Sequence, residues 1–201
     1  TTVDTGDYTN IHPPDKQTPS RRLANQALRI LYKQQDVEGE FPFYASQSVS
    51  MSQANGATTA TVTVAIRSGR PGSQSKVQLT TNAPLAATQS TTLGKGVLLP
   101  RNKCVTSVTE GFGHGIKTFP EFCGYPTIYG TTANGTVVGL NASANIGSDG
   151  SSIVLSAIVP SEGLNVTGTS YGRATWPLTV FFSKAGLPVI PWFASMRATD
   201  P

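Results

Sequence analysis

The feature that most constrains the fold is an alternation over Ala60–Ile66, in which Thr61, Thr63 and the small Ala65 separate the apolar residues. Successive side chains of a β-strand point to opposite faces of a sheet, so this period of two predicts a strand with one buried face. A second alternating run, Ser48–Ser52, lies just before it, and Asn55-Gly56 separates the two. Because Asn-Gly favours the tight turn between antiparallel strands, the two runs predict a β-hairpin.

Other runs of β-branched and aromatic residues, bounded by turn-forming residues, predict further strands. They are Lys76–Leu79, Val97–Leu99, Cys104–Val108, Thr136–Leu140, Ser152–Val159, Leu178–Phe182 and Pro188–Phe193. Asp149-Gly150 predicts a hairpin turn before Ser152, and the prolines of the last run predict an edge strand. The Gly- and aromatic-rich segment 111–130 is predicted to fold over one face. About nine short strands predict an all-β fold, a β-sandwich of the jelly-roll, lectin-like kind, over residues 44–201.

The first 36 residues have a different pattern. Pro13 and Pro14 exclude a helix at His12 and predict a rigid turn there. After this turn, apolar residues at helical spacing predict a helix to about Lys33, with Thr18 as its N-cap. Its predicted apolar face consists of Leu23, Ala24, Ala27, Leu28 and Leu31. Residues 37–43, which are acidic and contain Gly39 and Pro42, predict a linker.

Three segments near the start resemble a known family. They are Asn10-Ile11-His12-Pro13, Asp15-Lys16-Gln17 and Arg21-Arg22-Leu23-Ala24-Asn25-Gln26-Ala27-Leu28. Together they are similar to the C-terminal end of the sialate O-acetylesterases, SGNH-type carbohydrate esterases, in the form carried by bacterial prophages. The resemblance covers roughly the first 35 residues. It implies that residues 1–36 end an α/β esterase domain and that His12 is the catalytic general base for a serine nucleophile.

The sequence departs from that family in two places. Thr9 occupies the position where many relatives have an aspartate that orients the histidine, so Asp4, Asp7 or a backbone carbonyl would take that role. The family's nucleophile lies in a Gly-x-Ser-type block near the start of its domain, and no such block precedes His12 in this sequence. We therefore expect the parent protein to be a serine hydrolase, and the 201 residues alone to be inactive because the nucleophilic serine is absent.

The composition limits the classes of partner. Charged residues make up only 13% of the chain, and the formal net charge of +4 is not concentrated in a basic cluster, so nucleic acid is not an expected partner. No apolar run approaches the roughly 18 residues of a membrane span. Cys104 and Cys123 lack the spacing of a zinc site, and they are either paired or two unpaired thiols. We predict no metal site and no cofactor.

Carbohydrate binding is the function that the second part of the chain supports best. The segment Thr169–Trp176, predicted as a loop, holds Tyr171, Arg173 and Trp176. Aromatic rings stack on the C–H faces of sugars, and arginine grips a carboxylate with two parallel hydrogen bonds. The expected partners are sialylated and O-acetylated mucin-type glycans and the upstream esterase domain of the same chain. We expect the protein to act extracellularly after release from a bacterial host.

Two other functions remain open. The β-region would alternatively be a structural module for oligomerisation or surface attachment of a phage-derived protein. In the other alternative it is an independent hydrolase that uses His114, although its few carboxylates do not form the close pair that glycoside hydrolysis needs.

Overall fold

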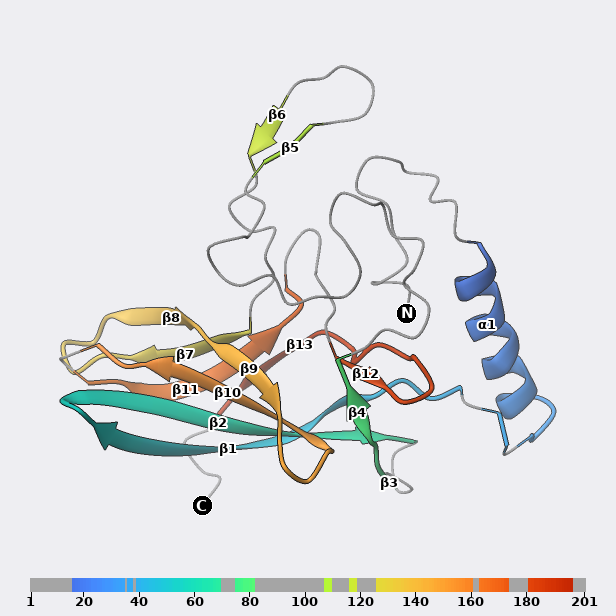
Figure 1. The fold of residues 1–201 in the computed structure, drawn as a ribbon, viewed down its shortest axis with the longest axis horizontal. Coiled ribbons are helices and arrows are strands. Elements are labelled where there is room, and N and C mark those ends of the chain that lie inside the picture. Colours follow the sequence, from blue (N-terminus) through green and yellow to red (C-terminus); the bar gives the residue numbers. More distant parts are fainter. Residues whose placement is uncertain are drawn as a thin grey trace.

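The computed structural model describes residues 16–34, 36–37, 39–69, 75–81, 107–109, 116–118, 126–160, 163–173 and 181–196. Within these ranges there are one helix and thirteen strands, and every strand pairing is antiparallel (Figure 1). The prediction of an all-β fold after a short helical segment is therefore confirmed. No helix in the described ranges has the length and apolar content needed to cross a membrane.

The first sheet is built on the predicted hairpin, with the strand order β1-β2-β10-β9 and with β3 also paired to β2. Its strands are β1 (Phe43–Ala54), β2 (Ala57–Ser68), β3 (Ser75–Lys76), β9 (Ser143–Ile146) and β10 (Ser152–Ile158). Asn55 and Gly56 have φ angles of 51° and 74°. Two residues with positive φ form the type I′ turn, whose twist matches that of antiparallel strands, so the Asn-Gly prediction is confirmed.

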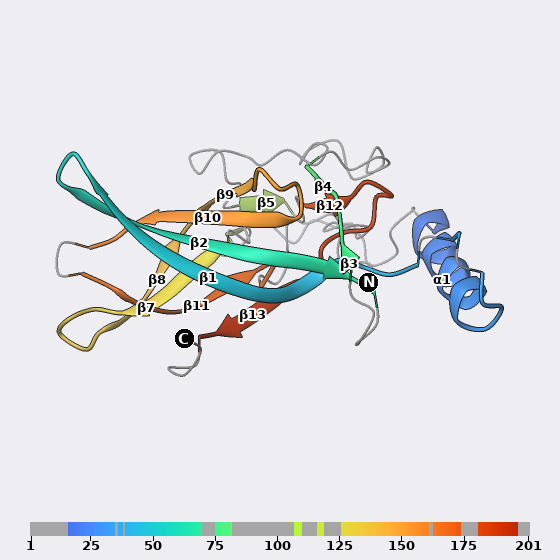
Figure 2. The same cartoon turned by 90° about the horizontal axis from the view of Figure 1, so that it is seen from below.

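The second sheet has the order β13-β11-β7-β8. Its strands are β7 (Thr127–Thr131), β8 (Val137–Asn141), β11 (Asn165–Tyr171) and β13 (Trp192–Ser195). The described residues also contain two short strand pairs: β4 (Leu79–Thr80) with β12 (Phe182–Ser183), and β5 (Ser107–Thr109) with β6 (Ile116–Thr118). Figure 2 shows the first sheet and the second sheet lying along each other for most of their length.

One hydrophobic core joins the two sheets. Alternate residues of β2, among them Val62 and Val64, are fully buried, as is Leu155 of β10. Ile128 and Tyr171 of the second sheet belong to the same cluster. Each large apolar side chain buried in this way contributes roughly 1.5–3 kcal/mol relative to exposure. The period of two in the sequence thus fixes which face of each sheet is turned inward.

The strand predictions were wrong in several places. Lys76–Leu79, predicted as one strand, is divided between β3 and β4. The last strand, predicted to begin at Pro188, begins at Trp192.

Three further errors concern β7, β11 and β9. Residues 127–130 belong to strand β7 and not to a segment that covers a face, and Thr169–Tyr171 lie in strand β11 and not in a loop. The turn at Asp149-Gly150 connects β9 with β10, and β9 was not predicted. β9 and β11 are rich in Ser, Thr, Asn or Gly, so their local propensity is weak, and pairing with neighbouring strands decides their conformation.

The helix α1 (Gln17–Ile30) begins before the predicted cap and ends before Lys33. Its N-cap position is Lys16, which makes no side-chain capping hydrogen bond, and Thr18 lies inside the first turn. Pro19 also lies in that turn, where its missing N–H leaves no helical hydrogen bond unmade.

The predicted apolar face of α1 is not the face that contacts the β-structure. Leu23 and Leu31 are 69% and 71% exposed, whereas Arg22 is only 8% exposed. The Arg22 Nη2 donates to the carbonyl oxygen of Gly186 at 3.1 Å, and its guanidinium carbon lies 5.8 Å from the centre of the buried Phe41 ring. Arginine can bury its stem and still satisfy its donors, so it replaces the leucines at this contact.

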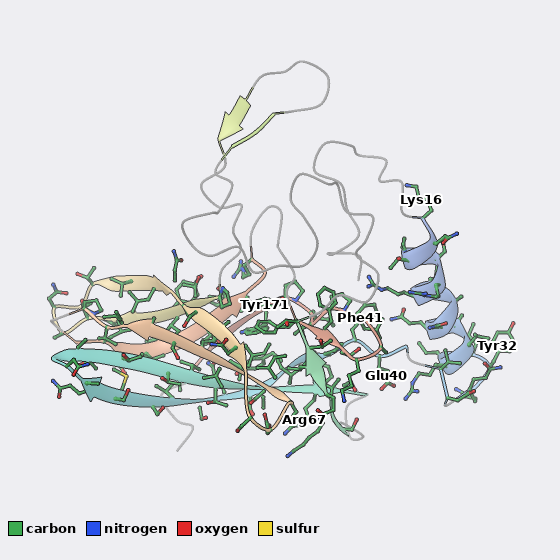
Figure 3. All side chains as sticks on the ribbon, viewed as in Figure 1. Lys16, Tyr32, Glu40, Phe41, Arg67 and Tyr171 are labelled. Carbon is green, nitrogen blue, oxygen red and sulfur yellow. The ribbon has the colours of Figure 1, made fainter. Side chains whose placement is uncertain are left out.

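A second arginine, Arg29, forms an ion pair that holds the segment after the helix. Arg29 Nε donates to Glu40 Oε1 at 3.0 Å, and Arg29 Nη1 donates to the carbonyl oxygen of Val37 at 3.3 Å. Figure 3 shows Glu40 and Phe41 on the chain between α1 and the sheets. The segment predicted as a linker is therefore tied to the helix at one end and to the core at the other.

We predict that Arg22→Ala releases α1 from the β-structure. The substitution removes the hydrogen bond to Gly186 and the cover over Phe41, so amide hydrogens of α1 should exchange about tenfold faster, equivalent to a loss of roughly 1.4 kcal/mol. Hydrogen exchange measured by mass spectrometry tests this. Arg21→Ala, at an exposed position of the same helix, is the matched control and should leave exchange unchanged; equal exchange in both variants would contradict the role of Arg22.

The turn between β9 and β10 is held by a carboxylate. Asp149 accepts hydrogen bonds from the hydroxyls of Ser151 and Ser152 at 2.6 and 2.7 Å and from their backbone N–H groups at 3.1 Å. The Ser151 hydroxyl, followed by the Ser152 hydroxyl, holds the pKa of Asp149 well below its usual range. The ionised carboxylate therefore fixes the start of the central strand β10.

We predict that the stabilisation provided by Asp149 is lost in acid. Its folded-state pKa is depressed, so its contribution is present above the unfolded pKa of about 3.9 and disappears as the pH falls through the folded value. Asp149→Ala should lower the free energy of unfolding by about 1 kcal/mol near neutral pH, a small value because the carboxylate is exposed to solvent. Urea unfolding across a pH series should show the two proteins converging in acid; a constant difference would contradict this.

Candidate functional site

The structure describes two of the four predicted site residues. His12 and Trp176 lie outside the described residues, as do His114, Cys104 and Cys123. Arg173 is exposed just after the end of β11, and Tyr171 is the last residue of that strand. The site can therefore be built only around the surface that Arg173 reaches.

Tyr171 lies in the core and not on that surface. Its ring is fully buried and packs against the rings of Trp192 and Phe181, with centroids 4.8 and 5.7 Å away. Its hydroxyl accepts the backbone N–H of Phe181 at 3.3 Å. A ring enclosed in this way has no face open to a ligand from solvent, so Tyr171 is not retained as a sugar-stacking residue.

The outer face of the second sheet carries two aromatic side chains, an exposed Phe193 and a half-buried Tyr129. Ile128 and Thr169 pair with each other and are buried, so they point inward. The residues next to them in β7 and β11, Tyr129 and Ser170, therefore point to the outer face, where Ser170 is covered and only 3% exposed. In β13 the same alternation turns Trp192 inward and Phe193 outward, and Phe193 is 56% exposed.

Four residues of this outer face, Tyr129, Ser170, Arg173 and Phe193, form what we call the aromatic platform. The rings of Tyr129 and Phe193 meet edge to face, with centroids 5.6 Å apart and planes at 66°. The Arg173 guanidinium carbon lies 4.9 Å from the centre of the Phe193 ring. The hydroxyls of Tyr129 and Ser170 are 3.1 Å apart and hydrogen-bonded. The platform thus combines an exposed ring, a second ring and a cation.

Two glycines shape the platform. Gly139 lies opposite Tyr129 on β8, and a Cβ there would come within 3.2 Å of Thr127 and 3.3 Å of the Tyr129 ring. Gly172 has a φ of 66°, which other residues rarely adopt, and it turns the chain immediately before Arg173. The glycines therefore let the Tyr129 ring lie close to β8 and direct the chain from β11 to Arg173.

A hydrogen-bonded network supports the platform from the core side. The Thr169 hydroxyl donates to Oε1 of Gln47 in β1 and accepts the indole N–H of Trp192 at 3.2 Å. These contacts join β1, β11 and β13. Because Thr169 and Trp192 are the immediate neighbours of Ser170 and Phe193, the network fixes the backbone that carries the platform.

The platform has the chemistry of a binding site. An exposed aromatic ring offers a flat face to the C–H groups of a sugar. A guanidinium stacked on a ring keeps its N–H groups available in its own plane, and these suit a carboxylate. Within the described ranges, no group of three or more His, Cys, Asp or Glu side chains could hold a metal ion.

Comparisons with known proteins add no family to this description. No family model matches the chain, and no curated protein matches it either.

Of the platform residues, the sequence predicted only Arg173 as a candidate and missed its two aromatic neighbours. Phe193 was assigned only to a terminal edge strand, and Tyr129 to a segment with no predicted strand. The signal for Phe193 was present, because a residue next to a buried tryptophan in a strand must point the other way. Tyr129 could be found only by recognising Thr127–Thr131 as a strand that pairs with β11.

Proposed function

We propose that the β-region is a carbohydrate-binding module, a β-sandwich of the jelly-roll or lectin-like kind, that binds sialylated and O-acetylated mucin-type glycans. The observation that carries the proposal is the exposed ring of Phe193 between Tyr129 and the Arg173 guanidinium. Aromatic side chains are usually buried, and exposing one lowers solubility. An exposed ring stacked with a cation therefore favours a ligand-binding role.

The proposed binding mode assigns a separate task to each group. The pyranose C–H face stacks on Phe193, and the Tyr129 ring limits its sideways movement. Arg173 pairs with the carboxylate of the acidic sugar. Side chains on the same outer face then meet the sugar hydroxyls; the exposed Asn141 of β8 and Ser195 of β13 are the nearest in register.

The proposal also includes the parent enzyme. Residues 1–36 would be the end of a sialate O-acetylesterase domain, in which His12 takes the proton of a serine nucleophile located elsewhere in the parent protein. The module would then hold the esterase close to its glycan substrate and raise the local substrate concentration without taking part in the chemistry. The support for this part is the motif around His12 in the sequence.

Two substitutions test the binding site. Phe193→Ala removes the stacking face, and we expect the affinity for a sialylated oligosaccharide to fall about tenfold. Arg173→Gln replaces the guanidinium with a shorter, uncharged polar side chain, and it should weaken binding of the sialylated oligosaccharide but not of its desialylated form. Isothermal titration calorimetry measures both effects.

The matched control is Ile158→Ala, which removes an apolar side chain that is 72% exposed on the outer face of the other sheet. It should leave the affinity unchanged. If the folded Phe193→Ala protein binds the glycan as well as the unmodified chain does, the platform is not the binding site. If the unmodified chain binds no glycan of this class, the proposed function is wrong.

A further inference from the structure

Strand β1 is an unusually long open edge. Within the described ranges it pairs only with β2, and it has 12 residues. The other strands that end a sheet are much shorter: β9 and β13 have four residues each and β8 has five. In Figure 1, β1 runs along the border of the ribbon with β2 on its inner side.

This edge lacks the usual protection against pairing with another strand. No Lys, Arg, Asp, Glu or Pro occurs between Phe43 and Ala54. The only irregularity in the β1–β2 register lies between Tyr44 and Ser46, near the start of the strand. Natural proteins normally protect edges with charges, prolines, bulges or short strands, so a long neutral edge indicates a surface that pairs.

The register shows which backbone groups the edge offers. Ala54 and Ala57 close the two-residue turn, and the closing pair of such a hairpin is hydrogen-bonded. Bonded and non-bonded pairs then alternate along β1. Four residues of β1 therefore direct their N–H and C=O groups away from β2: Gln47, Val49, Met51 and Gln53. On the other side of β2, the backbone N–H of Ile66 donates to the carbonyl oxygen of Ser151, and the N–H of Val159 donates to the carbonyl oxygen of Thr58. Both hydrogen bonds fit the same alternation.

The sequence of this edge is nearly symmetrical, with chemically similar residues at equal distances from its centre. Residues 47–53 read Gln-Ser-Val-Ser-Met-Ser-Gln, with Ser50 at the centre. A strand that pairs antiparallel with a copy of itself places residues at equal distances from the centre opposite each other. About Ser50, Gln47 would lie opposite Gln53, Ser48 opposite Ser52, and Val49 opposite Met51, so every pair is chemically matched.

We propose that β1 pairs with β1 of a second copy of this chain, antiparallel, about a two-fold axis at Ser50. In this register all four outward-directed residues fall in hydrogen-bonded pairs, which gives about eight N–H···O=C bonds between the copies. The register also brings Met51, which is 46% exposed, beside Val49 of the second copy. No charge repulsion opposes the contact, because β1 contains no charged residue in either copy.

One buried polar atom favours the same register. Within the described residues, Nε2 of Gln47 is buried without a hydrogen-bond partner, while its Oε1 accepts from Thr169. In the proposed dimer the amide of Gln53 of the second copy lies opposite Gln47 and offers a carbonyl oxygen. A buried donor without a partner costs about 1–3 kcal/mol in general, so a contact that supplies its acceptor is favoured.

The proposed dimer leaves the aromatic platform free. The platform lies on the outer face of the second sheet, and β1 belongs to the first. The dimer would present two platforms on one rigid body, which raises the avidity for multivalent glycans. The dimer itself does not depend on the proposed function, since its evidence lies entirely in β1.

Sedimentation of the whole chain tests the proposal through Ser50, which is exposed and points away from the core. The unmodified chain should show a concentration-dependent dimer. Ser50→Lys and Ser50→Glu each place two like charges across the axis and should weaken the dimer about tenfold or more. A one-to-one mixture of the two variants should restore dimers, because each lysine then meets a glutamate.

Val137→Lys is the control, because it adds the same charge at a position that is 74% exposed on β8, and it should dimerise normally. Met51→Pro gives an independent test, since it removes only an outward-directed N–H and should abolish the dimer without breaking the β1–β2 ladder. A monomer at all concentrations, a stable trimer, or mixed variants that stay monomeric while their circular dichroism is native would each overturn the proposal. Glycan binding by a monomeric variant at one platform would leave the proposed function intact.

Discussion

The rest of the structure depends on the burial of alternate β2 side chains against the inner face of the second sheet. Val62, Val64 and Ile66 are fully buried, and they share one core with Ile128 and Tyr171. Since a strand turns its neighbouring side chains the other way, burial of one set fixes the exposure of the other. A slip of one residue in any central strand would expose the core and bury hydroxyls, and this cost defines the register.

The two surfaces on which the proposals rest follow from that register. In the second sheet, burial of Trp192 and Thr169 turns Phe193 and Ser170 outward, beside Tyr129. In the first sheet the same rule turns Ser48, Ser50 and Ser52 outward along β1. One sheet therefore presents aromatic rings with a cation, and the other presents a neutral row of hydroxyls at an open edge. The different chemistry of the two surfaces suits different partners.

Much of the architecture could be predicted from the sequence, because it is encoded locally. The β1–β2 hairpin follows from the alternation around Asn55-Gly56, and the all-β class follows from the number of short strands. β11 could not be predicted in this way, since its polar residues become buried only through pairing with β7 and β13. The sequence predicted an apolar face for α1 that contains its leucines, but Arg22 makes the contact with the β-structure, because a carbonyl oxygen and a ring on distant segments provide its partners. The site was predicted only at Arg173; its aromatic partners come from strands that lie far away in the sequence.

The most direct test of the central claim is a backbone and side-chain NMR titration of the isotopically labelled chain with a sialylated, O-acetylated oligosaccharide. The account predicts that the largest shift changes fall on the Arg173 guanidinium and on the rings of Phe193 and Tyr129. Signals from the serine row of β1, Ser48, Ser50 and Ser52, should barely move. Changes confined to that serine row, or no change at the aromatic platform at saturating glycan, would contradict the account.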